Sequence, residues 1–375
     1  MTTPLRATRA EINLDNLKHN LSSFREQIAA KTKIMAVVKA DGYGHGAVEV
    51  SKVALEHGAT WLGVAFVEEG IKLREHGFEV PLLVLNSPFA NQVELFFKHN
   101  LIPTVFTKDM ARLFSKHAVE RKQKKEIHLK VDTGMGRVGV FPYTAAEEYL
   151  ENVRKLPNLT VGGIYTHFAT ADEKDKSYAE LQLQRFLDLI NRLKKKGICP
   201  PLVHAANSAA ALEIPESWLG MVRLGISMYG HYPSKEVDKK IIALKPLMNL
   251  KSSISFLKLV PAGTCISYGC TWVTEKETRV ATIPLGYGDG YSRLLSNKAH
   301  VLIRGKRHPV IGRVCMDQFM VDVSADPKIK AGDEVILFGE QGNQPISVEE
   351  IADLLGTINY EVLCAVGKRV PRVYL

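Results

Sequence analysis

The stretch of sequence that decides the fold is Val37-Val38-Lys39-Ala40-Asp41-Gly42-Tyr43-Gly44-His45-Gly46. Residues 34–38 are apolar or β-branched, a pattern typical of a strand buried on both faces. The three glycines exclude regular structure just beyond that strand. We therefore predict that Lys39 stands at a strand end, partly removed from water. An amine in that environment can lose its proton near neutral pH and form a Schiff base with a carbonyl; the alternative is a surface lysine before a flexible turn.

Apolar runs of strand length alternate with amphipathic segments of helical length along most of the chain. The strand-like runs are eight: 34–38, 61–64, 82–85, 102–106, 127–131, 161–165, 202–204 and 221–224. The helix-like segments include 47–57, 68–76, 109–117 and 178–196. Eight such units predict a (β/α)8 barrel of the TIM type, and an open doubly wound sheet is the alternative with a similar alternation.

The placement of polar residues favours the barrel. Five positions at or just after predicted strand ends carry polar side chains: Lys39, Lys130, His167, Asn207 with Ser208, and Arg223. Barrel enzymes place their chemistry at this end of the strands. Each residue alone could be an ordinary polar residue at a strand end, but together they indicate one shared site.

The chain changes character near Lys245-Pro246. Short segments rich in Thr, Val and Ile follow, at 252–260, 278–283 and 334–338, and they predict a mainly β second domain. Ser347-Val348-Glu349-Glu350 has the pattern of a capping box that starts one short helix, which Gly356 ends.

The start of the chain predicts a short strand over residues 9–14 and a helix that Asp15 caps. The predicted architecture is α/β. It consists of an N-terminal strand in residues 1–12 that packs with the C-terminal domain, a (β/α)8 barrel in residues 13–244, and a mainly β domain in residues 245–375.

Composition narrows the classes of function. The 375 residues are 46% hydrophobic and carry a net charge of +9, so apolar content suffices for two cores. The densest basic clusters, 121–125 and 194–196, fall in helix-like connecting segments, and we interpret them as solvated faces rather than a nucleic-acid site. A positive field also favours anionic ligands.

Cysteine usage and the N-terminus indicate a cytoplasmic protein. The five cysteines are odd in number and form no C-x-x-C pair, which argues against a disulfide framework and a zinc site. Met1-Thr2-Thr3-Pro4-Leu5-Arg6 lacks a signal-peptide core, and no apolar stretch reaches the ~18 residues of a membrane helix. We expect a soluble protein with no metal and no membrane partner.

Six segments in chain order resemble alanine racemases. They are the stretch around Lys39 and residues 128–137 (HLKVDTGMGR), 166–173 (THFATADE), 267–269 (SYG), 312–318 (GRVCMDQ) and 369–374 (RVPRVY). The matches span nearly the whole chain, which makes them more specific than a single motif. The resemblance implies a cytoplasmic isomerase that binds pyridoxal 5'-phosphate, interconverts L-alanine and D-alanine, and supplies D-alanine for peptidoglycan.

The resemblance also implies the two bases that a racemase needs. Lys39 holds the cofactor as an imine and serves the D-enantiomer, whereas Tyr268 serves the L-enantiomer from the opposite face. Because tyrosine has an ordinary pKa of about 10, its phenolate needs stabilisation, for which His167 and Arg223 are the candidates. In the family this tyrosine comes from the partner subunit, so the resemblance implies a head-to-tail homodimer with composite active sites.

Cofactor binding is implied for Lys39, Tyr43, His167, Ser208, Arg223, Gly225, Ile226 and Tyr360. Arg223 matches the arginine that faces the pyridine nitrogen and, because it stays protonated, leaves that nitrogen neutral. His204 matches the residue that orients this arginine; the alternative is an ordinary core histidine. Ser208 is also a candidate helix N-cap.

Substrate binding is implied for Arg137, for the backbone amide of Met316 and for Tyr287. Arg137 and the amide of Met316 hold the substrate carboxylate. Tyr287 and Tyr360 restrict the access channel to small side chains. Asp317 has an orienting role. Lys130 matches a lysine that many members carry as a carbamate, N6-carboxylysine, which pairs with Arg137. An unmodified lysine would repel that arginine, and the alternative is an ion pair with Asp132.

Four rival functions stay open. Gly288 stands where alanine is frequent in the family, so a broader racemase that also accepts serine is the first alternative. A decarboxylase of basic amino acids has a related architecture, but segments 267–269 and 314–317 favour racemisation. A cofactor carrier without activity would not need the second domain. A nucleotide site is the weakest, because the chain has neither G-x-G-x-x-G nor G-x-x-x-x-G-K-[ST].

Overall fold

The computed structural model describes residues 6–375 and divides them into two compact units. The first, which we call the barrel unit, comprises Asn16–Gly42 and Ala47–Lys245. The second, the C-terminal unit, comprises residues 6–15, Tyr43–Gly46 and Pro246–Leu375. Within residues 6–375 no helix is long and apolar enough to cross a membrane, and the five cysteines are free.

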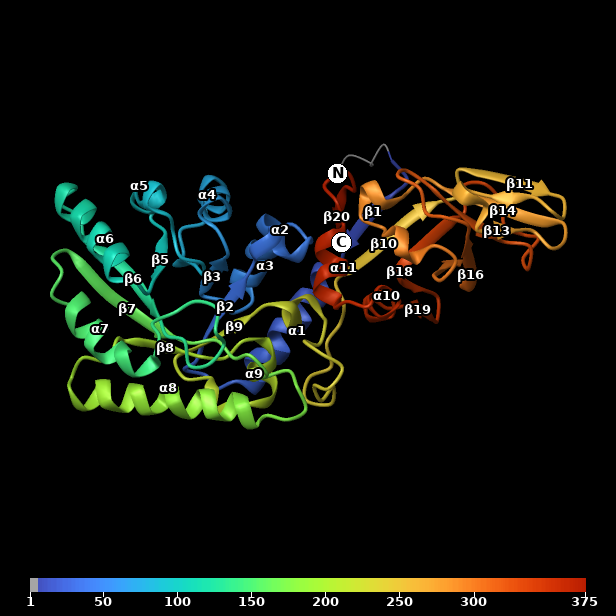
Figure 1. The fold of residues 1–375 in the computed structure, drawn as a ribbon. Helices are drawn as coiled ribbons and strands as arrows, with labels where there is room; N and C mark the ends of the chain where they lie inside the picture. The colour runs from blue at the N-terminus through green and yellow to red at the C-terminus, as the bar shows by residue number, and fades with distance from the viewer. Residues whose placement is uncertain (1–5) are drawn as a thin grey trace. The chain divides into compact units, whose positions relative to one another are not determined.

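The barrel unit contains a parallel sheet of eight strands (Figure 1). They are β2 (Lys33–Val37), β3 (Trp61–Val64), β4 (Leu82–Val84), β5 (Ile102–Val105), β6 (Lys125–Lys130), β7 (Leu159–Tyr165), β8 (Leu202–His204) and β9 (Met221–Leu224). Their order is β8-β7-β6-β5-β4-β3-β2-β9. Two hydrogen bonds join the ends, from Gly220 N to Val203 O (2.9 Å) and from Arg223 N to Ala206 O (3.0 Å). The predicted barrel is therefore confirmed over an open sheet.

Helices alternate with these strands along the chain, and those between β4 and β8 lie on the outside of the sheet in Figure 1. They are α1 (Leu14–Gln27), α2 (Lys39–Tyr43), α3 (Ala47–Glu56), α4 (Val67–Glu75), α5 (Val93–Lys98), α6 (Lys108–Glu120), α7 (Ala146–Val153), α8 (Ser177–Lys195) and α9 (Ser208–Glu213). One expectation was wrong, since α1 begins at Leu14 and Asp15 lies inside its first turn. There the carboxylate favours the helix dipole without being the N-cap.

The C-terminal unit is mainly β. Its strands are β1 (Arg9–Ile12), β10 (Met248–Ser253), β11 (Phe256–Val260), β12 (Cys265–Ile266), β13 (Trp272–Val273), β14 (Thr278–Ile283), β15 (His300–Ile303), β16 (Lys306–Ile311), β17 (Phe319–Asp322), β18 (Glu334–Gln341), β19 (Gln344–Ile346) and β20 (Arg372–Tyr374). β1 pairs antiparallel with β10 and parallel with β20, so segments from both ends of the chain share one sheet. Residues 1–5 of the expected N-terminal strand segment lie outside the described residues.

Two helices complete this unit, α10 (Val348–Leu355) and α11 (Asn359–Ala365). Ser347 caps α10 by accepting the Glu350 amide at 3.0 Å, and Gly356 ends the helix with φ +68°. The Glu350 carboxylate pairs with Arg307 at 2.6 Å, so the predicted box has the serine half only. The predicted short helix between Ser347 and Gly356 is confirmed, and α11 is a second helix that the sequence analysis did not predict.

Lys125 corrects the interpretation of the first basic cluster as a solvated face. It belongs to strand β6, is only 6% exposed, and donates from Nζ to Phe96 O at 2.6 Å. Burial and the nearby charge of Arg74 lower the pKa of the Lys125 ammonium from 10.5 to about 8. The folded state therefore binds this proton more weakly than the unfolded state does.

This weaker binding has a measurable consequence for stability. Since the unfolded chain holds the proton up to its ordinary pKa, stability rises as the pH increases from about 8 toward 10.5. The free energy of unfolding of the wild type, relative to Lys125→Met, should rise by roughly 2–3 kcal/mol between pH 7 and pH 10. Urea titrations at both pH values measure this, with exposed Lys124→Met as the control. An equal difference at both pH values would contradict it.

Candidate active site

Lys39 follows β2 at the start of a left-handed turn. Ala40 and Asp41 both have φ of 52°, and Gly42 has φ of 65°. Left-handed backbone costs a residue with a side chain about 1 kcal/mol or more, so the surrounding structure must hold this turn in place. The Asp41 carboxylate contributes by accepting the amide of Ala47 at 3.2 Å. Lys39 is half-buried at the carboxyl end of the barrel strands.

Arg223, in β9, is the most highly connected side chain at this end of the barrel. Its guanidinium donates to Nδ1 of His204 and to Nδ1 of His167, each at 3.1 Å. It also donates to the carbonyl oxygens of Thr166 and Ala205, each at 2.9 Å. Within residues 6–375 its Nε–H has no protein acceptor. Burial lowers the pKa of Arg223 to about 10, so the side chain stays charged at neutral pH.

The histidines around Arg223 are neutral. Burial and the charge of Arg223 hold the pKa values of His167 and His204 well below the ordinary range. Since Nδ1 of each ring accepts from Arg223, the proton of each ring is on Nε2. His204 Nε2 lies 3.2 Å from Nδ1 of His128, whose Nε2 is 3.4 Å from Glu126. These contacts are the geometry that the orienting role of His204 requires, and that role stays a prediction.

His128 is a site residue that the sequence interpretation missed. It is fully buried, and its place behind His204 extends the support of Arg223 by one more ring. A signal was present, because His128 is two residues from Lys130 on one strand and alternate strand residues share a face. Burial lowers the pKa of His128 as well.

Lys130, at the end of β6, lies in a strongly positive environment. Burial, with the charges of Arg137 and Arg223, lowers the pKa of its ammonium to about 7. Its Nζ lies 5.4 Å from the ring centre of Tyr165. Within residues 6–375 it forms no ion pair with Asp132, whose Oδ1 accepts the amides of residues 134–136 at 2.8–3.1 Å. The alternative of a Lys130–Asp132 ion pair is therefore not formed.

A cradle of hydrogen-bond donors follows β8 and β9. The Ser208 hydroxyl accepts the amide of Gly225 at 2.9 Å, which leaves its own proton to donate. Ile226 opens the 3-10 turn η4 (Ile226–Tyr229), so its amide has no acceptor within that turn. The buried hydroxyl of Ser227 has no partner within the described residues. Ser208 is not the N-cap of α9, because Asn207 has that place and accepts the Ala210 amide at 3.0 Å.

In the C-terminal unit, Tyr268 stands on the turn η5 (Tyr268–Cys270) and is 72% exposed. The preceding Ser267 has φ of 66° and donates its hydroxyl to Arg313 O at 2.7 Å. This bond fixes the base of the turn. The phenol ring is consequently presented outward from the unit by an anchored backbone.

A cleft of about 880 Å³ in this unit is lined by Tyr268, Tyr287, Met316 and Asp317, among others. The turn η6 (Tyr287–Asp289) is tied to the cleft by the Gly288 amide, which donates to Met316 O at 2.9 Å. The Asp317 carboxylate accepts from Arg369 at 2.7 Å. Four predicted residues from three separate segments of the chain thus meet at one surface.

The two tyrosines among the predicted cofactor-binding residues also meet. Tyr43 belongs to the part of the glycine-rich stretch that packs in the C-terminal unit, and Tyr360 to α11. Their ring centres are 6.0 Å apart. This contact brings together residues more than three hundred positions apart in the chain.

Comparisons with known families cover both units. The family model described as alanine racemase, N-terminal domain, matches residues 12–233, and the one described as alanine racemase, C-terminal domain, matches residues 247–374. The chain belongs to the alanine racemase family. The resemblance drawn from six segments is thereby confirmed over both units, as is the fold expected from it.

Alanine racemases similar to this chain are known from several organisms. The alanine racemase of Desulforamulus reducens is 52% identical over 366 residues, which cover 98% of each chain. A solved alanine racemase of Clostridium difficile 630 superposes with a TM-score of 0.95 at 42% identity, covering 100% of this chain and 97% of that one. A crystal structure of the alanine racemase from Bacillus anthracis with bound L-Ala-P has a TM-score of 0.94 at 38% identity, covering 100% and 96%.

The assignment of the three histidines can be tested directly. In ¹⁵N-histidine-labelled protein, long-range ¹H–¹⁵N spectra should show His128, His167 and His204 as neutral Nε2–H tautomers, because Nδ1 of each ring accepts a hydrogen bond. Burial keeps His167 and His204 neutral, so the shifts of these two rings should not change from pH 6 to pH 9. Loss of one set of signals in His204→Gln identifies the signals of His204. An imidazolium signal for His167 or His204 at pH 6.5 would refute the assignment.

Proposed function

We propose that this member of the alanine racemase family racemises alanine with pyridoxal 5'-phosphate held at the carboxyl end of the barrel. The observation that carries the proposal is the buried, charged Arg223, which neutral His167 and His204 fix in place. Such an arrangement presents a donor that cannot transfer its proton. Membership of the alanine racemase family supports the proposed reaction. The arrangement of Arg223 and the two histidines supports pyridoxal phosphate as the cofactor.

The donors around Arg223 fit this cofactor. The uncommitted Nε–H of Arg223 suits a neutral ring nitrogen, and the proton of Ser208 with the amide of Ile226 suits a phosphate. The orphaned hydroxyl of Ser227 is a further donor there. We propose that the cofactor would be held by Lys39, Tyr43, His167, Ser208, Arg223, Gly225, Ile226 and Tyr360.

The chemistry divides between the cofactor and the chain. When bound, pyridoxal phosphate withdraws the electron pair left when the α-proton is removed. Arg223 remains protonated at neutral pH and does not protonate the ring nitrogen, which limits transamination. The chain itself supplies the bases, the carboxylate site and the exclusion of large side chains.

Two residues move the α-proton in the proposed mechanism. Lys39 takes it from or returns it to one face, serving D-alanine, and Tyr268 does so at the opposite face for L-alanine. The Nε2–H of His167 remains a donor that can stabilise the phenolate of Tyr268. We propose a homodimer in which Tyr268 comes from the partner subunit, a role that suits its exposed ring.

The substrate carboxylate would be bound by Arg137 and by the amide of Met316. Tyr287 would restrict the pocket to small side chains, and Asp317 would orient Arg369, with which it pairs. This arrangement favours alanine over larger amino acids. We further propose a cytoplasmic location, with which the five free cysteines are compatible. The proposed role there is to supply D-alanine for peptidoglycan.

Lys130 is proposed to carry a carbamate. With a pKa of about 7, its amine is substantially neutral at physiological pH and can attack carbon dioxide. The bond from Nζ to carbon forms, one C=O bond becomes C–O⁻, and the amine proton passes to water. The product is an anion among the charges of Arg137, Arg223 and Lys39, so it relieves their repulsion.

The function is tested by supplying the purified protein with pyridoxal phosphate and incubating it with L-alanine and, separately, with L-serine. Chiral chromatography measures each D-enantiomer. Conversion of alanine alone is expected, because Tyr287 limits the side chain. Comparable conversion of serine would favour the broader racemase, and no conversion of either would overturn the proposal.

The two bases predict different isotope patterns. Lys39→Ala should lose activity by at least about 10³-fold and lose exchange at both enantiomers. Tyr268→Phe should bind cofactor and still exchange the α-proton of D-alanine with D₂O, without forming L-alanine. NMR of the recovered amino acid measures this, with Tyr143→Phe as the control. Full racemisation by Tyr268→Phe would refute its role as a base.

The carbamate is tested by ¹³C NMR in ¹³C-bicarbonate. One protein resonance should appear and grow from pH 6 to pH 8, since the neutral amine increases through a pKa of about 7. It should be lost in Lys130→Ala and kept in Lys125→Met, the second buried lysine. Lys130→Ala should lower kcat/KM roughly 10- to 100-fold, the equivalent of one charge-assisted hydrogen bond. A resonance that survives Lys130→Ala would contradict the assignment.

A further inference from the structure

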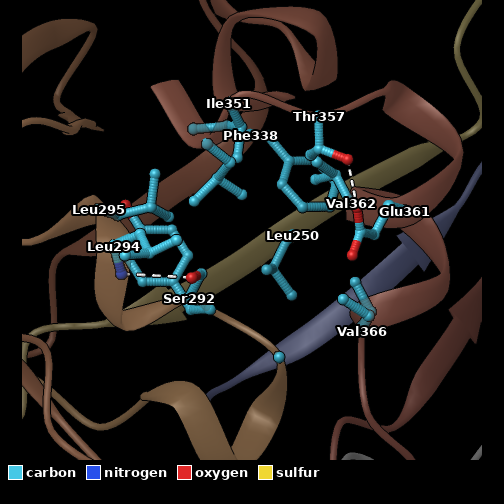
Figure 2. Close-up of a pocket in the computed structure, with 14 residues that line it drawn as sticks. Leu250, Ser292, Leu294, Leu295, Phe338, Ile351, Thr357, Glu361, Val362 and Val366 are labelled. Atoms are coloured by element: carbon cyan, nitrogen blue, oxygen red, sulfur yellow. Dashed lines mark hydrogen bonds between the residues drawn. The ribbon is translucent and has the colours of Figure 1, made fainter. Parts of the chain in front are cut away.

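Two features of the described residues stand apart from the function proposed above. One is a cavity of about 270 Å³ in the C-terminal unit, where Leu250, Phe338 and Val362 are directed toward a common space (Figure 2). Its lining is largely apolar and indicates no particular ligand. The other is the carboxylate of Glu69 in the barrel unit, which contacts the turn that follows Lys39.

The Glu69 carboxylate accepts three backbone amides. Its Oε1 accepts the amide of Ala40 at 2.6 Å, and its Oε2 accepts the amides of Ala65 at 2.7 Å and Phe66 at 3.2 Å. The bonds to residues 65 and 66 cap the start of α4, in which Glu69 is the third residue. The bond to Ala40 is not needed for that cap. It connects the helix to the residue that directly follows Lys39.

Helix α4 is a firm support for this carboxylate. Val67 and Leu73 of the same helix are buried, so the helix is anchored in the core of the barrel unit. One turn further along the helix, Lys72 Nζ donates to Oδ1 of Asp41 at 2.8 Å. Two side chains of α4 therefore hold two successive residues of the turn, Ala40 and Asp41.

The turn needs such support because its backbone conformation is unfavourable. Ala40 and Asp41 both have φ of 52°, a left-handed conformation that residues other than glycine rarely adopt. Loss of the acceptor for the Ala40 amide would let the turn relax toward a commoner conformation. Lys39, the residue directly before it, would then move as well.

We propose that Glu69 is a positioning residue for Lys39. By accepting the Ala40 amide, the carboxylate holds the left-handed turn and fixes the backbone from which the Lys39 side chain extends. A charged acceptor suits this task, because hydrogen bonds to a carboxylate are stronger than those to a neutral oxygen. The inference rests on the function proposed above, in which Lys39 holds pyridoxal phosphate. In that reaction Lys39 Nζ forms a double bond to the aldehyde carbon, and the aldehyde oxygen leaves as water.

Two matched ligands separate this covalent bond from the rest of cofactor binding. Pyridoxal phosphate has the aldehyde, whereas pyridoxine 5'-phosphate has an alcohol in its place and cannot form the bond. Calorimetric titration of the cofactor-free, full-length protein with each ligand measures the two dissociation constants. Their ratio reports the contribution of Lys39, and the wild type should bind pyridoxal phosphate the more tightly.

Glu69→Asp tests the reach of the carboxylate. It keeps the negative charge at the start of α4 and shortens the side chain by one methylene group, which withdraws the acceptor from Ala40. The preference for pyridoxal phosphate over pyridoxine phosphate should fall about three- to thirtyfold. The dissociation constant of pyridoxine phosphate should stay unchanged, because the proposed phosphate donors are not altered. Should Glu69→Asp fail to fold, Glu69→Ala replaces it.

The control is Glu68→Asp, the same change at the neighbouring exposed position of α4, which should leave both dissociation constants unchanged. Racemisation by the cofactor-saturated protein provides a second measurement. In Glu69→Asp, kcat for alanine should fall about three- to thirtyfold because Lys39 is displaced. KM should stay nearly unchanged, since the proposed carboxylate site at Arg137 is not altered.

The titrations separate a positioning role from a structural one. A preference for pyridoxal phosphate that is unchanged in Glu69→Asp, or an equal loss of affinity for both ligands, would overturn the inference. A wild type that does not prefer pyridoxal phosphate would instead refute the role proposed for Lys39, and with it the inference. The first two results appear only in the variant and the third in the wild type, so these failures are distinguishable.

Discussion

Positive charge concentrated at the carboxyl end of the barrel is the constraint on which the site depends. Burial, with the charges of Arg137, Arg223 and Lys39, lowers the pKa of Lys130 to about 7. The Asp132 carboxylate, which acts on Lys130 in the opposite direction, is committed to backbone amides. Such a cluster is unfavourable unless anions neutralise it. A phosphate, a substrate carboxylate and a carbamate are the anions that the proposed function brings there.

The same field determines how Arg223 is held. A protonated histidine beside it would repel the guanidinium, and burial with that charge keeps His167 and His204 neutral. Neutral rings can accept at Nδ1, so among the described residues 6–375 the arginine is positioned by neutral acceptors and not by a carboxylate. Because no carboxylate neutralises it, the guanidinium keeps its full charge toward the ligand. A charged guanidinium facing the cofactor disfavours protonation of the cofactor's ring nitrogen.

Sequence reasoning predicted the elements better than their interior contacts. Runs such as 34–38 were recognised because strands buried on both faces are nearly continuously apolar. The role of His128 and the orphaned hydroxyl of Ser227 depend on which side chains tertiary packing brings together, and local pattern does not encode that. The sequence analysis places Lys125 on a solvated face because its neighbours in the chain are charged. Its own position in β6 faces inward. Site residues came mainly from family resemblance, and their roles remain proposals.

Mixing the two inactive subunits tests most directly whether the barrel site and Tyr268 act together across a dimer. Lys39→Ala and Tyr268→Phe proteins, each inactive alone, are dissociated, combined in equal amounts and reassociated with pyridoxal phosphate. Half of the dimers are then mixed and each has one intact site, so alanine racemisation should return to about 25% of the wild-type rate. Activity that stays at the level of the separate variants would contradict a composite site.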